Sequence, residues 1–225
     1  MQVGGHSVEI TRKRIKHLYL RVKAPGTVQV SAPKHWPMLY VRSLVKARQN
    51  WIEQQLDKLA QQPTMLAPSY EEGATIYFTG KAYQLRAVAT SQRAMVSIND
   101  PHITLQLKQP TDLVARERLL DKWYRQQLKQ RIEQLLDYWQ PIMRVAASDF
   151  GVRKMKTRWG SCNIRSKKIW LNFDLIKKAP ESLEYVVVHE LTHLYERYHN
   201  QRFYRLMDEF LPDWQARKHS LNHHE

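Results

Sequence analysis

Cysteine is nearly absent from this sequence, which also contains no long apolar run. Cys162 is the only cysteine among 225 residues, so an intrachain disulfide is excluded. No apolar stretch approaches the roughly 18 residues that a membrane span needs. Residues Met1–Ser7 also lack the apolar core of a signal peptide. We therefore expect a cytoplasmic protein in a reducing compartment, without a membrane partner.

Glycine is scarce as well. The chain has only seven glycines, and none of them stands in a Walker or Rossmann spacing. Loops of those two kinds need glycine because its missing side chain lets backbone amides approach phosphates closely. The sequence therefore lacks the common glycine-rich loops with which proteins hold nucleotides.

Acidic side chains are few relative to basic ones. The chain carries 21 Asp and Glu against 36 Lys and Arg, which gives a formal net charge of +15 at pH 7. The excess is concentrated in residues 1–62 and in residues 153–168, and the second stretch has seven basic residues and no acidic one. This balance favours an acidic partner such as nucleic acid or a nucleotide, although a basic surface also serves solubility.

Hydrophobic periodicity predicts a mainly β region with one helix over residues 1–110. Alternating apolar residues indicate strands within residues 7–32, and helical spacing follows over residues 37–61. Two prolines mark residues 62–69 as a linker. Further strands are predicted at residues 74–79, 82–89, 93–99 and 102–107.

Residues 111–225 are predicted to form a second domain, mainly helical with a small β-sheet. Thr111 or Asp112 can cap a long helix that reaches about Trp139, and Pro141 is expected to stop it. The later elements are predicted as strands over Val152–Arg158 and Lys168–Phe173, a helix from near Pro180 to near Tyr198, and a helix over Gln201–Phe210. Together the two regions indicate an α+β fold.

The strongest candidate for a functional motif is the run His189-Glu190-Leu191-Thr192-His193. Two histidines four residues apart on a helix lie about 40° apart around its axis and about 6 Å apart along it, so both can bind one small cation. Glu190 falls on the same side, where it can accept a proton from water at the metal. We therefore predict a zinc site with Glu190 as general base. The alternative is a buried polar cluster satisfied by hydrogen bonds.

A catalytic zinc site needs a third protein ligand and keeps a fourth position for water. His199 follows His193 by six residues, as in the metzincins, but Glu196 stands where those enzymes carry a glycine at the turn. The rival ligand is Glu209, sixteen residues past His193. We favour His199, because an imidazole so close to the pair would otherwise have no role.

Several other side chains are candidates for a role at the site, each with a structural alternative. Arg158 can bind an anionic substrate or pair with an acid, and Asn172 can line the site or cap a turn. Tyr195 and Tyr198 can donate to an oxyanion or complete the core. Cys162 can act as a nucleophile, but a cysteine in a Gly-Ser-Cys turn is more often structural.

These motifs resemble the signature of the YgjP-like metallopeptidase-domain family. The resemblance extends over nearly the whole chain and rests on Thr157–Cys162, Ile169–Asn172, Tyr185–His193, His199 and Phe203. It implies that residues 111–225 form a zincin-like catalytic domain, with His189, His193 and His199 as zinc ligands. It also implies kinship with minimal zincin peptidases and SprT-like proteases, in which a strand beside the helix holds extended substrate.

The sequence supports three hypotheses about function. The first is a zinc-dependent metallopeptidase in which Lys168–Asn172 serves as an edge strand that binds peptide. The second is a nucleoside triphosphate pyrophosphatase, because members of the family have been labelled UTP pyrophosphatases and Arg153–Lys168 is basic. The third is a nucleic-acid-associated zinc protein whose basic N-terminal half contacts phosphates. The N-terminal region is also a candidate regulator of access to the site.

Overall fold

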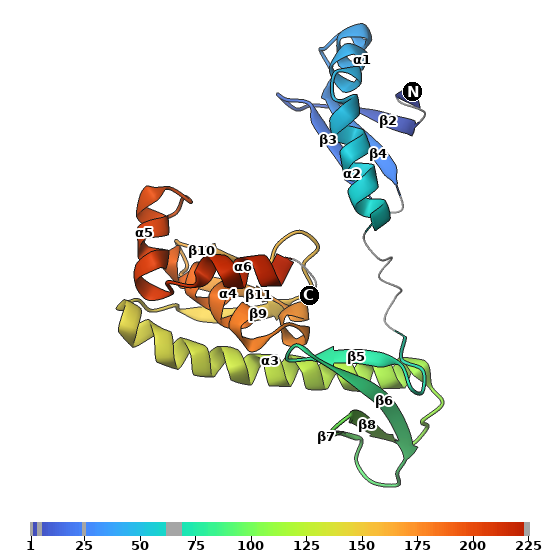
Figure 1. Ribbon diagram of the computed structural model, residues 1–225, viewed down its shortest axis with the longest axis vertical. Helices are drawn as coiled ribbons and strands as arrows, with labels where there is room; N and C mark the ends of the chain where they lie inside the picture. The colour runs from blue at the N-terminus through green and yellow to red at the C-terminus, as the bar shows by residue number, and fades with distance from the viewer. Residues whose placement is uncertain (1, 4–5, 24–25, 62–68, 223–225) are drawn as a thin grey trace. The chain divides into compact units, whose positions relative to one another are not determined.

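The computed structural model describes residues 2–3, 6–23, 26–61 and 69–222 (Figure 1). Contacts divide the chain into two compact units, Met1–Pro68 and Ser69–Glu225, which we call the N-terminal and C-terminal units. The boundary predicted at residue 110 falls inside the C-terminal unit. The linker predicted at residues 62–69 lies, apart from Ser69, outside the described residues. Among the described helices, none is long and apolar enough to span a membrane.

The N-terminal unit is a four-stranded sheet with two helices. Its elements are β1 (Gln2–Val3), β2 (His6–Lys13), β3 (Tyr19–Lys23), β4 (Thr27–Pro33), α1 (Met38–Lys46) and α2 (Gln49–Gln61). The strand order is β1-β2-β4-β3, with β2 parallel and β3 antiparallel to β4. Alternation places Val28 and Val30 of β4 in a core that Val45 and Ile52 of the helices complete.

The single helix predicted over residues 37–61 is instead two helices. The amide of Ala47 donates to Ser43 O at 2.9 Å, but that of Arg48 donates to Val45 O at 3.1 Å, a tighter turn that redirects the chain. Val45 and Ile52 on the two sides of the break are both buried. The apolar spacing therefore continues through the turn, which is why the sequence pattern did not show it.

The C-terminal unit begins with a sheet that packs on a long helix. The strands are β5 (Thr75–Phe78), β6 (Lys81–Ala89), β7 (Met95–Asn99) and β8 (His102–Leu107), in the order β5-β6-β8-β7. They confirm the four strands predicted here. Phe78 shares a hydrophobic core with Tyr124 of the helix, and the Tyr124 hydroxyl donates to Tyr77 O at 2.7 Å. These contacts place residues 75–107 with the C-terminal unit.

The long helix is α3 (Leu113–Met143). As predicted, Asp112 caps it, because its carboxylate accepts from the amides of Val114 at 2.9 Å and Ala115 at 3.1 Å. The helix does not stop at Pro141 but ends two residues later, where Arg144 adopts a left-handed φ of 50°. A proline in the last turn removes only one helical hydrogen bond, so the helix passes through it.

A second sheet lies beside the C-terminal helices. Its strands are β9 (Asp149–Arg153), β10 (Gly160–Asn163) and β11 (Lys168–Asn172), in the order β10-β11-β9. The prediction that Lys168–Asn172 is an edge strand is therefore wrong, because β11 pairs on both sides. The edge strand next to the helices is β10, whose short Gly-Ser-Cys-Asn sequence carries little strand signal.

The remaining elements are η1 (Phe173–Lys177, a short 3₁₀ helix), α4 (Pro180–Thr192), α5 (Gln201–Phe210) and α6 (Trp214–Asn222). Helix α4 contacts α3, α5, α6 and strand β10, so it lies at the centre of the unit (Figure 1). It ends at Thr192, earlier than the predicted end near Tyr198. Helix α5 has the predicted bounds, and α6 was not predicted.

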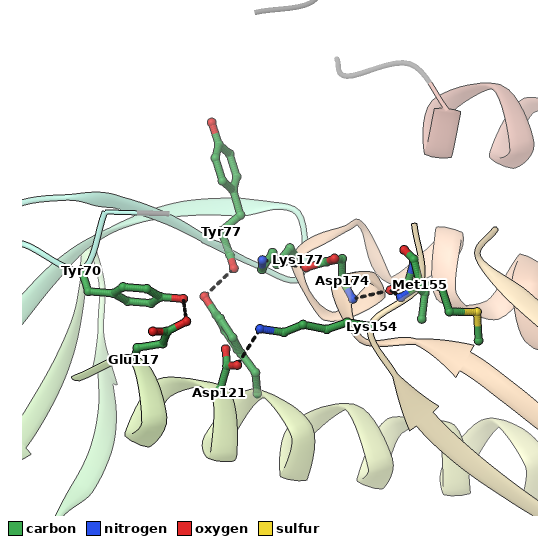
Figure 2. A network of polar contacts seen from close by, with 10 residues as sticks. Tyr70, Tyr77, Glu117, Asp121, Lys154, Met155, Asp174 and Lys177 are labelled. Atoms are coloured by element: carbon green, nitrogen blue, oxygen red, sulfur yellow. Dashed lines mark hydrogen bonds and ion pairs between the residues drawn. The ribbon is translucent and has the colours of Figure 1, made fainter. Parts of the chain in front are cut away.

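A polar network holds the segment that leads into β10 (Figure 2). Lys154 Nζ lies 2.8 Å from Asp121 Oδ2 on α3. The Asn172 side-chain amide donates to the carbonyls of Met155 at 3.0 Å and Arg158 at 3.1 Å. The segment is thus fixed to α3 at one end and to β11 at the other, which positions the residues that enter the site.

Candidate metal centre

Three histidines converge at the end of α4. His189 lies in its last turn, His193 is the residue after its end, and His199 precedes α5. The Nε2 atom of His199 lies 3.0 Å from that of His189 and 3.1 Å from that of His193. Two nitrogen ligands of a tetrahedral zinc ion stand about 3.3 Å apart. Within the described residues, this is the one group of histidine, cysteine and carboxylate side chains identified as able to hold a metal ion.

The hydrogen bonding of the rings also fits a cation. His193 Nδ1 lies 3.0 Å from the carbonyl of Glu196, which can only accept, so Nδ1 carries the proton and Nε2 presents a lone pair. Burial, and then the electrostatic effect of the neighbouring His193 and His199, lowers the pKa of His189 to about 3. The ring of His189 is therefore neutral at pH 7, as a ligand must be.

The turn after α4 explains how His199 returns to the pair without a glycine. The amide of Tyr195 donates to Thr192 O at 3.0 Å, and the Glu196 carboxylate accepts from the amide of Tyr198 at 3.2 Å. None of the residues of this turn has a left-handed φ. The glycine of the metzincin spacing is therefore not needed here, and Glu196 supports the turn instead.

Phe203 of α5 packs against all three histidines of the candidate metal site. Its buried ring lies 5.0, 4.8 and 4.7 Å, centroid to centroid, from the rings of His189, His193 and His199. The rival ligand Glu209 is exposed on the same helix and is not a member of the group. The structure thus brings His199, rather than Glu209, to the pair.

Glu190 is buried beside the histidines, with 4% of its surface exposed. Its Oε2 atom has no hydrogen-bond partner within the described residues. Burial raises the pKa of the carboxyl to about 8, and the charge of Arg158 opposes this effect. A buried carboxylate oxygen without a partner costs about 1–3 kcal/mol or more, so the site fits a water molecule or a cation that would satisfy it.

Gly160 allows Glu190 to take this position. A Cβ atom placed on Gly160 would lie 2.5 Å from Oε1 and 2.8 Å from Cγ of Glu190, closer than such atoms approach one another. The glutamate therefore packs directly against the backbone of β10. The one signal of this contact in the sequence is the glycine itself, in a chain that has only seven of them.

Comparison with known protein families matches residues 16–224 to the family described as YgjP-like, metallopeptidase domain. The chain belongs to the YgjP-like metallopeptidase-domain family. The resemblance seen in the sequence is thereby confirmed. No curated protein matches the chain.

Solved structures similar to this YgjP-like chain include two metallopeptidase zymogens. Abylysin from Pyrococcus abyssi is 23% identical, with a TM-score of 0.35, over 39% of this chain and 86% of abylysin. Jannalysin from Methanocaldococcus jannaschii is 18% identical, with a TM-score of 0.36, over 40% of this chain and 93% of jannalysin.

In this YgjP-like chain a cavity of about 1080 Å³ opens over the histidines and Glu190. Its walls come from the segment Arg158–Arg165, from α4 and the turn after it, and from the end of α6. Of the predicted substrate-binding residues, Arg158 and Tyr195 line it. The Tyr195 hydroxyl, however, donates to the carbonyl of Met143 at the end of α3, so it is already bonded.

Asn172 does not line the cavity. It is buried, and its side chain bonds to the backbones of Met155, Arg158 and Asp174. The expectation that Asn172 contacts substrate is not supported by this placement, since every polar atom of its side chain holds the chain itself. Asn172 therefore acts on the site by holding in place the segment that carries Arg158.

Cys162 does line the cavity, from β10. Burial, and then the charge of Glu190, raises the pKa of its thiol to about 11. Tyr198 is 65% exposed and is not part of the cavity wall. Sequence reasoning missed the contribution of α6, whose Asn222 accepts from the Trp159 indole at 3.2 Å and whose Lys218 faces the site.

Proposed function

We propose that this chain is a zinc-dependent metallopeptidase in which His189, His193 and His199 hold the ion and Glu190 is the general base. The observation that carries the proposal is the convergence of three Nε2 atoms next to a buried, unpartnered carboxylate oxygen. Membership of a metallopeptidase-domain family supports hydrolysis of peptides. An all-imidazole donor set suits zinc among the common divalent ions.

The proposed chemistry divides between the ion and the chain. Zinc, when bound, polarises the scissile carbonyl and lowers the pKa of a water molecule towards about 7. Glu190 accepts the proton of that water as it attacks and then gives it to the leaving amine. The position of Glu190, buried in the cavity wall with an Oε2 atom that has no partner within the described residues, suits it to take the proton.

The substrate is proposed to lie along β10 rather than along β11. Within the described residues, strand β10 pairs with β11 on one side only, and its residues Gly160–Asn163 all line the cavity. An extended peptide can add to such an edge through main-chain hydrogen bonds, as in other cases of β-augmentation. This arrangement would bring the scissile bond past Glu190, which packs against Gly160.

A nucleoside triphosphate pyrophosphatase is the second candidate. The observation in its favour is the set of cationic side chains in the cavity wall, Arg158, Arg165, Arg197 and Lys218. Against it stands the lack of a glycine-rich phosphate loop. A nucleic-acid-associated role rests only on the basic charge of the N-terminal unit. The single unpaired cysteine supports a cytoplasmic location for all three.

The test is a turnover screen of the zinc-loaded protein with a peptide pool and with nucleoside triphosphates, run beside Glu190→Gln. We expect peptide cleavage that the variant loses by about 10²–10⁴-fold while it keeps its zinc, because only the proton acceptor has been removed. Glu209→Gln, an exposed glutamate on α5, is the matched control and should retain activity. Products from triphosphates alone, or full activity in Glu190→Gln, would reject the proposal.

A further inference from the structure

Four cationic side chains from three segments of the chain line the cavity. Arg158 lies before β10, Arg165 follows it, Arg197 lies in the turn after α4, and Lys218 belongs to α6. Glu190 is the only acidic residue among the described residues of the wall, and it is buried. The exposed charged side chains of the wall are therefore all positive.

These cations are not neutralised by the protein. Within the described part of the chain none of the four forms an ion pair, whereas Arg217 nearby pairs with Glu184 and Asp213. Two of them lie over aromatic rings: the Arg197 guanidinium is 5.5 Å from the centroid of the Tyr198 ring, and Lys218 Nζ is 5.6 Å from that of the Trp214 ring. Their charge is therefore available to a ligand.

The charge also reaches the reacting centre. The four cations line the same cavity as the three histidines and Glu190. A cleft lined by one sign of charge concentrates ligands of the opposite sign and raises their association rate by about 10–10³-fold. A substrate in this cavity thus meets positive potential on several sides of the position where the bond would be cleaved.

The rest of the wall favours a peptide over a polyphosphate. Trp159, Ile164, Leu194 and Leu221 add apolar surface between the cations. The cations are spread over three segments instead of being gathered in one loop that could hold a chain of phosphates. The edge of β10 that no described strand covers offers backbone groups, which match an extended peptide and not a nucleotide.

We propose that the cavity selects acidic peptides, with Asp or Glu side chains within a few positions of the scissile bond bound by Arg158, Arg165, Arg197 and Lys218. Arginine suits this task because its planar guanidinium binds a carboxylate through two parallel hydrogen bonds. The inference rests on the proposed peptidase function and adds the class of substrate to it.

The test compares two pools of fluorogenic peptides of equal length, one with Asp and Glu and one with Asn and Gln at the same positions, on the zinc-loaded full chain. We expect kcat/KM about tenfold or more higher for the acidic pool, with a preference that shrinks as salt is raised. The variant Arg165→Glu/Arg197→Glu should lose the preference. The control Arg93→Glu/Arg118→Glu makes the same charge change on exposed residues outside the cavity and should keep it.

A binding measurement separates this inference from the peptidase proposal. Fluorescence anisotropy with the Glu190→Gln protein should show tighter binding of the acidic peptides than of their amide counterparts, whether or not the wild type cleaves either pool. Acidic binding without any cleavage would overturn the peptidase and support the inference. Equal handling of the two pools, or tight binding of a nucleoside triphosphate together with no binding of the acidic peptides, would overturn the inference.

Discussion

Gly160 and Glu190 are in direct contact across the interface between β10 and α4: a Cβ atom at position 160 would stand 2.5 Å from Oε1 of the glutamate. Glu190 therefore owes its position to the absence of a side chain on the neighbouring strand. The residue proposed as general base and the strand proposed to hold substrate are thus fixed against each other.

Gly160→Ala should displace the Glu190 carboxylate and lower kcat/KM at least about tenfold, because a small misplacement of a catalytic group costs up to about 10²-fold. Zinc content should not change, since the three histidines are untouched. Gly151→Ala is a matched control, because its Cβ would lie 2.4 Å from the Trp170 ring and not against Glu190. It should lower the melting temperature and leave the kcat of the folded protein intact. An unaltered kcat/KM in Gly160→Ala would contradict the account.

Tyr195→Phe is expected to affect stability more than turnover. The hydroxyl donates to Met143 O and ties the turn after α4 to the end of α3, so its loss should lower the free energy of unfolding by about 1 kcal/mol. Urea denaturation and steady-state kinetics measure the two effects. A fall of about 10²-fold in kcat with unchanged stability would instead assign Tyr195 a role in stabilising an oxyanion.

Cys162 should be unreactive at neutral pH. Its thiol pKa is raised to about 11 by burial and by the charge of Glu190, so the thiol stays protonated well above pH 8. Alkylation by iodoacetamide should be about tenfold or more slower than that of a free cysteine at pH 7, and should accelerate as the pH rises towards 11. Cys162→Ala should keep its peptidase activity. Rapid alkylation at pH 7 with loss of activity would restore the nucleophile hypothesis.

A chain of residues 69–225 should fold alone, and one of residues 111–225 should not. The shorter chain lacks Ile76, Phe78, Leu85, Ile103 and Leu105, which share one core with α3. Each such burial contributes about 1.5–3 kcal/mol, and their sum is comparable to the whole stability of a domain. Thermal unfolding followed by circular dichroism measures the difference. Equal melting temperatures of the two chains would instead support a domain boundary at residue 110.

Local regularities made much of this protein predictable from its sequence. The convergence of His189 and His193 follows from their spacing near a helix end, and the cap at Asp112 and the alternating strands of residues 75–107 follow from short-range rules. His199 was favoured because it follows His193 by only six residues, and the family resemblance implied the same ligand; the structure places it against the pair.

The features that could not be predicted depend on tertiary contacts. The sequence of β10 carries little strand signal of its own, and the strand forms because β11 provides a partner. Asn172 belongs to the segment Ile169–Asn172, on which the family resemblance partly rests. Its side chain nevertheless bonds to backbone groups and does not line the cavity. Lys218 reaches the cavity from α6, a helix whose weakly amphipathic sequence did not reveal it.

The central claim is that His189, His193 and His199 bind one zinc ion. The most direct measurement is the zinc-to-protein ratio, determined by elemental analysis after dialysis against metal-free buffer, for the wild type, His199→Ala and Glu209→Ala. The account predicts a ratio of about one for the wild type and for Glu209→Ala, and a large loss of zinc in His199→Ala, because two imidazoles hold zinc far more weakly than three. Full zinc in His199→Ala together with its loss in Glu209→Ala would contradict the account.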